Sequence, residues 1–120
     1  MSVYDELYSL TRALSNSKEF SDYKRTAERV DSDEMHSRML KDFITAQMQI
    51  SSAKMLGTDP TDEMINHFNM LYSAISGIGS INEFLMAQAA FMTILDDVTR
   101  EIAKAVDVDV NFLKILPDFN

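Results

Sequence analysis

The sequence contains no cysteine and no tryptophan, and its 120 residues include only three glycines and two prolines. Without cysteine there is no disulfide, no thiolate metal site and no cysteine nucleophile. No glycine-rich phosphate loop, serine elbow or nucleophile–base spacing occurs. The missing tryptophan also removes the Trp-x-Gly turn of secreted helical-hairpin proteins. We therefore expect a protein that is not an enzyme and that carries no cofactor.

Length and hydropathy are typical of one small globular domain. With 46% hydrophobic and 25% charged residues, residues 1–120 can close a single core. The longest nearly uninterrupted apolar run, Ala87–Leu95, is shorter than the roughly 20 residues of a membrane-spanning helix. The first residues lack the basic stretch and apolar core of an export signal. We expect no membrane insertion and a cytoplasmic location.

The charge is unevenly distributed. The net charge is −8, and residues 57–120 hold ten Asp and Glu against three Lys and Arg, whereas residues 1–56 hold nine against eight. An acidic surface repels phosphates, which argues against direct nucleic-acid binding. One basic stripe is present, but acidic residues interleave with it, which favours a solvated face with helical ion pairs. Its cations are Lys18, Lys24, Arg25, Arg29, Arg38 and Lys41.

Apolar residues recur at spacings of three and four along most of the chain, which is the period of an α-helix. Capping signals divide the pattern into five helices. We predict helices over residues 3–15, 18–30, 60–76 and 81–106, and a long third helix that opens at the capping box of residues 31–34 and ends at residue 56. The capping signals are Ser17 as an N-cap, capping boxes at Asp31–Glu34 and Ser80–Glu83, Gly57 as a left-handed stop, and Asp59-Pro60 opening the fourth helix. The fold class is all-α, a single-domain bundle with a long C-terminal helix.

The last helix carries three apolar rows with a seven-residue repeat, a stripe wider than a two-stranded seam needs. Four short neighbours do not easily cover it, so we expect a homo-oligomer, a dimer or larger. Gln88 lies within one row, where a polar residue either fixes register or is satisfied at a helix contact. The candidate interaction residues are Ile81, Phe84, Gln88, Phe91, Leu95 and Ile102, with Met39 and Phe43 on the third helix.

Methionine is abundant, with nine residues, four of them on the predicted third helix. Flexible thioethers suit surfaces that repack around several partners, and they also fill irregular cores. We interpret most of these methionines as core residues.

A metal-dependent helical phosphohydrolase is the alternative from another class. Asp96, Asp97 and Glu101 cluster on the last helix and resemble half of a Mg²⁺ site. No second pair at repeating spacing is found for a facing helix, so a solvated face is favoured. His36 and His67 each follow a carboxylate on one helical face, but they lie beside capping residues and are interpreted as surface histidines.

From Val106 to Phe112 apolar and polar residues alternate strictly, which indicates an extended segment. We therefore predict that residues 107–120 form an extended tail, which either packs on the bundle or pairs as a strand across an oligomer. Within it, Asp107-x-Asp109-x-Asn111 copies the first half of a calcium loop. Phe112 occupies the position where that loop requires glycine, so we do not predict a calcium site.

The order of these patterns resembles the YlbF/YmcA/YheA family of small helical bacterial proteins over residues 3–106. The resemblance rests on Tyr4-Asp5 with Leu7, Leu10 and Leu14, on Ser17-Lys18-Glu19-Phe20-x-x-Tyr23-Lys24, on Val30, Asp33, Phe43 and Gln47, and on Ile81-Asn82-Glu83-Phe84-Leu85-Met86-Ala87 with Phe91, Leu95 and Ile102.

The resemblance implies a self-associating helical bundle without catalytic residues. For some members it also implies a complex with sibling proteins that directs a membrane-tethered endoribonuclease and influences competence, sporulation and biofilm formation. Some members are thought to hold iron–sulfur clusters through cysteines. This sequence has no cysteine, so that property is not carried over.

Overall fold

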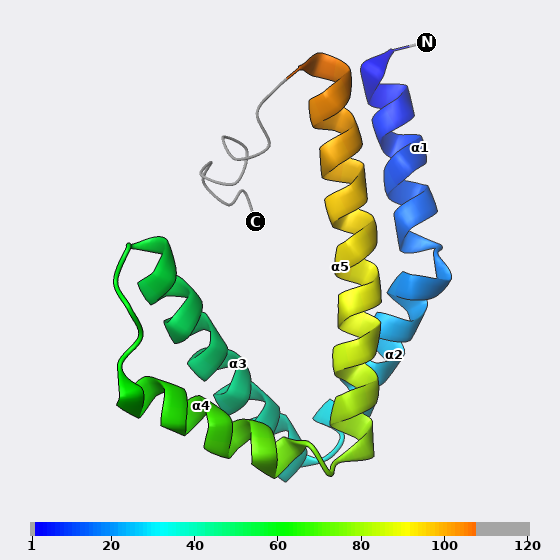
Figure 1. The fold of residues 1–120 in the computed structure, drawn as a ribbon. Coiled ribbons are helices and arrows are strands. Elements are labelled where there is room, and N and C mark those ends of the chain that lie inside the picture. Colours follow the sequence, from blue (N-terminus) through cyan, green and yellow to red (C-terminus); the bar gives the residue numbers. More distant parts are fainter. Residues whose placement is uncertain (1, 108–120) are drawn as a thin grey trace.

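The computed structural model describes residues 2–107, and within them it confirms five helices (Figure 1). They are α1 (Val3–Ser15), α2 (Lys18–Asp31), α3 (Glu34–Met55), α4 (Asp62–Ile75) and α5 (Gly79–Val106). The all-α fold class and the long C-terminal helix are therefore correct. The predicted tail and calcium-loop motif lie outside the described residues, apart from Asp107.

Two of the predicted helix ends are confirmed at the level of single atoms. Ser17 is the N-cap of α2, where its hydroxyl accepts a hydrogen bond from the Phe20 amide at 3.1 Å. Gly57 follows the end of α3 with a φ of 76°, a left-handed conformation that glycine adopts without steric cost. Both signals depend only on neighbouring residues, which is why the sequence reveals them.

Two of the predicted N-caps, Asp31 for the third helix and Asp59 for the fourth, are each wrong by two residues. The N-cap of α3 is Asp33, which has extended backbone angles, whereas Asp31 still belongs to α2. The N-cap of α4 is Thr61, whose hydroxyl accepts a bond from the amide three residues on, so Pro60 precedes the helix. In each case another residue whose side chain can cap a helix lies two positions further along the chain, and that residue has the extended backbone conformation of an N-cap.

The predicted capping box at Ser80 is also wrong. Helix α5 begins at Gly79 with Ile78 at the N-cap position, and no side chain caps it. The Ser80 hydroxyl is buried without a hydrogen-bond partner among the described residues. Asn82 instead joins the two helices, because its side-chain amide donates to the Ser76 carbonyl at 2.9 Å.

The five helices form two arms that meet at an angle (Figure 1). We call α1, α2 and α5 the long arm, α3 and α4 the short arm, and their junction the elbow. Both views show α1 and then α2 lying along α5, and α4 turns into α5 with a bend of 113°. The radius of gyration is 17.4 Å, against about 14 Å for a compact chain of this length. The molecule is therefore open rather than compact.

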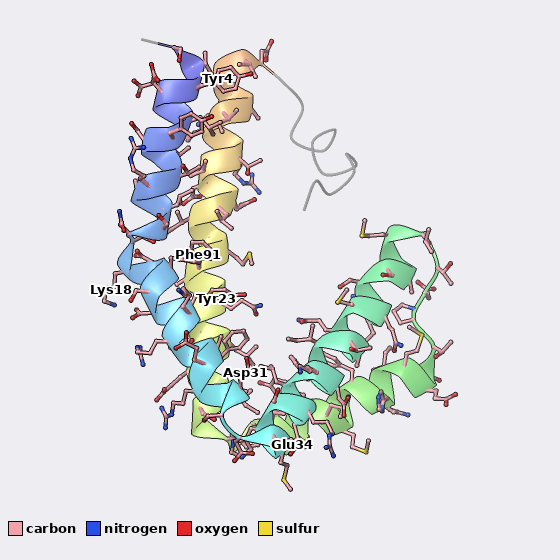
Figure 2. All side chains as sticks on the ribbon, turned by 180° about the vertical axis from the view of Figure 1, so that it is seen from behind. Tyr4, Lys18, Tyr23, Asp31, Glu34 and Phe91 are labelled. Carbon is pink, nitrogen blue, oxygen red and sulfur yellow. The ribbon has the colours of Figure 1, made fainter. Side chains whose placement is uncertain are left out.

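The core is concentrated at the elbow. Each of the last four helices contributes to one buried cluster formed by Val30, Leu40, Phe43, Ile75, Ile81 and Phe84. Aromatic rings extend it along the long arm, where Tyr23 of α2 lies 5.6 Å from both Phe84 and Phe91 of α5 (Figure 2). The elbow thus joins both arms through one set of apolar contacts.

Burial decreases along α5 from the elbow to its free end. Ile81 is 0% exposed, Leu95 is half-buried and Ile102 is 53% exposed, although all three belong to one seven-residue row. Near the elbow, α2 and core residues of the short arm cover this helix, whereas near its end α1 is the only described helix that lies beside it. The wide apolar stripe is therefore covered at one end and open at the other.

The interpretation of most methionines as core residues is wrong. Of the eight methionines in the described residues, none is buried, and six are exposed: Met35, Met48, Met55, Met70, Met86 and Met92. The physical reason is the open shape, because α3 and α4 cover each other on one side only. Helical spacing placed Met48 and Met55 on a common face of α3, but a third helix to cover that face is not among the described ones.

Candidate interaction site

The structure separates the eight candidate interaction residues into three groups. Three are core residues of the elbow, namely Phe43, Ile81 and Phe84. Four are half-buried, namely Met39, Gln88, Phe91 and Leu95, and Ile102 is exposed. Whether any of them contacts another protein stays a prediction. The three core residues hold the two arms together and are not accessible to a partner, so a surface that binds another protein must consist of other side chains.

The short arm exposes apolar side chains on both of its helices. Met48 and Met55 lie seven residues apart on α3, as do Ile65 and Tyr72 on α4, so each pair shares a helix face. We call these four residues the short-arm surface. Beside Met48 lies an open hollow of about 700 Å³, lined by Thr45, Met48, Gln49, Ser52 and Met64.

Tyr72 connects the short-arm surface to the core. Its ring lies 6.2 Å from the Phe43 ring and 6.4 Å from the Phe68 ring, while 55% of the residue remains exposed. Phe68 in turn lies 5.2 Å from Phe43. A contact made at Tyr72 therefore rests on a fixed aromatic cluster, which lowers the entropy cost of binding there.

The free end of the long arm is the second exposed apolar region. Helix α1 lies along α5 but has no buried residue. Val3, Tyr4, Leu7 and Tyr8 are exposed on α1, and Ile102 and Val106 are exposed on α5. We call these six residues the long-arm tip. Figure 2 shows Tyr4 at this end of the molecule, far from Asp31 and Glu34 at the elbow.

Of the ten residues in these two regions, only Ile102 was predicted as a candidate interaction residue, because helical periodicity marks an apolar face without saying which chain covers it. Val3 and Leu7 belong to a regular face that reads like a core face. Only the position of α1 relative to the other helices shows that the face remains open.

Charges surround these regions as paired surface groups. The predicted solvated stripe on α2 is confirmed, with Lys18 and Arg25 flanking Asp22 at 3.0 and 3.5 Å. The hydrogen bond from Lys18 is the main cause that lowers the pKa of Asp22 below its usual value. Arg29 pairs with Glu83 at 2.6 Å and joins α2 to α5.

Two of the three carboxylates of the phosphohydrolase alternative, Asp96 and Glu101, are paired with cations of their own helix. Asp96 accepts a hydrogen bond from Arg100 at 2.8 Å, which raises the pKa of the Arg100 guanidinium, and Glu101 lies 3.4 Å from Lys104. Among the described residues, no second group of carboxylates faces them. Across residues 2–107, no group of three or more His, Asp or Glu side chains is placed to hold a metal ion.

The two histidines are separate from one another and from these carboxylates. His36 is partly buried at the start of α3, with its ring nitrogen 3.5 Å from the Asp33 carboxylate. His67 is exposed on α4.

In the described part of the chain, no single helix has the length and apolar composition of a membrane span, and α4 and α5 meet those criteria only together, across their bend.

The fold and its surfaces define a class: a small, open, all-helical protein with one core at its elbow and exposed apolar helix faces. Residues 3–107 match the family model described as "Control of competence regulator ComK, YlbF/YmcA", and the chain belongs to this family. A UPF0342 protein of Symbiobacterium thermophilum is 32% identical over 93% of this chain and 100% of its own length. Another from Caldicellulosiruptor saccharolyticus is 33% identical over 88% of each chain, and one from Clostridium tetani is 28% identical over 93% of this chain and 97% of its own.

Proposed function

We propose that this protein is a non-enzymatic regulatory protein of the cytoplasm that acts through contacts with other proteins. The observation that carries the proposal is the exposure of large apolar side chains in two regions, the short-arm surface and the long-arm tip. Single exposed apolar residues are common on soluble monomers, but several of them on neighbouring helices favour a surface that another molecule covers. The family description, which concerns control of a competence regulator, supports a regulatory role.

We further propose that the protein forms homo-oligomers and joins a complex with sibling proteins of the same family, through which it modulates a membrane-tethered endoribonuclease. Two separate apolar regions support two kinds of contact, one with a second copy and one with a different partner. The short-arm surface suits the different partner, because two of its four residues are methionines, which adapt to partners of different shape.

The proposal is tested by affinity purification of the tagged protein from its native host, followed by mass spectrometry. We expect sibling family proteins and the endoribonuclease to be enriched with the unaltered protein. In a Met48→Asp/Met55→Asp variant their recovery should fall at least tenfold, because two desolvated charges would face the apolar contact.

A matched control is available on the same arm. Asn66→Asp/Ser73→Asp adds the same two charges, also seven residues apart, at exposed polar positions of α4. This control should recover the same partners as the unaltered protein. Absence of siblings and endoribonuclease from the unaltered sample would contradict the proposed function, whereas equal recovery with both variants would contradict the short-arm surface.

A further inference from the structure

We propose that α1 packs against α1 of a second copy in an antiparallel, two-fold symmetric contact centred on Tyr8. This inference rests on the self-association proposed above and assigns its surface. Its starting point is that α1 has no buried residue although it lies along α5. Helices of globular proteins derive most of their stability from a buried apolar face, and the apolar face of α1 is at most half-buried, at Leu10 and Leu14.

The exposed area at the long-arm tip matches what a stable dimer needs. Val3 is 82% exposed and Tyr8 is 56% exposed, and four further large apolar residues of the tip are exposed beside them. With roughly 150–250 Å² for each fully exposed large residue, the tip presents about 700 Å² of mainly apolar surface. A standard interface buries about 800 Å² on each partner.

The charges of α1 select an antiparallel second copy. Asp5 and Glu6 lie in the first turn and Arg12 lies in the last turn. An antiparallel pair places the acidic end of one helix beside the basic end of the other, twice, and opposes the two helix dipoles. A parallel pair would instead place Asp5 and Glu6 against the same carboxylates of the second copy.

The spacing of the exposed side chains fixes the centre of the contact. Tyr4, Tyr8 and Arg12 are four residues apart, so they form one row on the helix surface. A two-fold axis at Tyr8 brings Tyr8 against its own copy and Tyr4 against Arg12 of the second copy. Arg12 is available for this contact, since it forms no ion pair with a described residue and donates only to the Ser9 hydroxyl at 3.3 Å.

This reciprocal pattern favours a second copy over an unrelated partner. In a two-fold interface residue i meets residue j and j meets i, and a row of tyrosine, tyrosine and arginine satisfies that condition about its middle residue. Arginine stacks on tyrosine through a cation–π contact, so the two outer positions are complementary.

The cysteine-free chain permits a direct test, since any introduced cysteine is the sole thiol. The full-length Tyr8→Cys variant is treated with diamide, which accepts two electrons and two protons as two thiols join in a disulfide. We expect at least half of the protein to form a covalent dimer. Ser9→Cys is the matched control, because its exposed side chain is turned by about 100° around the same helix, and we expect it to cross-link at least tenfold more slowly.

A second experiment uses charge and does not depend on oxidation. Arg12→Asp should raise the dimer dissociation constant about tenfold, as measured by analytical ultracentrifugation, because acidic groups then meet at both ends of the contact. Combining it with Asp5→Lys and Glu6→Lys restores unlike charges and should return the constant to within threefold of its original value. Circular dichroism at 222 nm confirms that each variant is folded.

The outcomes separate this surface from self-association in general. A dimer by ultracentrifugation in which Tyr8→Cys cross-links no faster than Ser9→Cys would overturn the α1 contact while leaving self-association standing. A monomer at tens of micromolar would overturn both. Loss of binding in Arg12→Asp that the charge exchange does not restore would overturn the antiparallel arrangement.

Discussion

Replacing Ile81 by alanine tests whether the elbow carries the stability of the single chain. Ile81 is 0% exposed and belongs to the cluster that joins both arms. The substitution removes three buried carbons, each worth about 0.8 kcal/mol of transfer free energy, and leaves a cavity, so the free energy of unfolding should fall by about 2–5 kcal/mol. For a chain of this length, that corresponds to a decrease in melting temperature of roughly 8–20 °C.

Ile102→Ala provides an unusually close control. It changes the same residue type, on the same helix and in the same seven-residue row, but at a position that is 53% exposed. Ile102→Ala should lower the free energy of unfolding of the monomer by about 1 kcal/mol or less. Both values come from urea denaturation followed by circular dichroism at 222 nm, at a protein concentration below the dimer dissociation constant. Equal costs for the two variants would refute the argument that the core lies at the elbow.

Three further predictions concern single positions and use the same unfolding assay. Gly57→Ala should lower the free energy of unfolding by about 1 kcal/mol, because a φ of 76° strains any residue other than glycine. Gly79 lies in the first turn of α5 with open space around it, so Gly79→Ala should raise the free energy of unfolding by about 0.5–1 kcal/mol. Removing the α2 cap by Ser17→Ala should cost about 1 kcal/mol, and Ser21→Ala on the exposed face should change stability by less than about 0.5 kcal/mol. Gln88→Leu should raise the melting temperature, since the half-buried amide interrupts an apolar row; a decrease would place the amide in a satisfied network.

The candidate site was only partly predictable from the sequence. The row of Ile81, Gln88, Leu95 and Ile102 was read as one candidate contact surface. The structure divides that row between a buried core residue at one end and an exposed residue at the other. Periodicity could not make this division, because all four positions face the same direction from α5, and the difference lies in which helices stand opposite them.

The local structure follows from the amino-acid sequence alone. Five helices, the Ser17 cap and the stop at Gly57 follow from side chains and backbone angles that act within four residues. The three misplaced N-caps, at Asp31, Asp59 and Ser80, each lie two residues from the observed one. The charge pairs along α2 are equally local, since Lys18 and Asp22 are one turn apart.

Which apolar faces are core and which are surface depends on how the helices are arranged in space. The 113° bend between α4 and α5 sends the short arm away from the long arm, so α5 is covered near Ile81 and open near Ile102. The same bend leaves Met48 and Met55 exposed on a helix whose pattern suits a core. Whether a side chain is buried depends on which segment packs opposite it, and the spacing of residues along one helix does not predict contacts between distant segments.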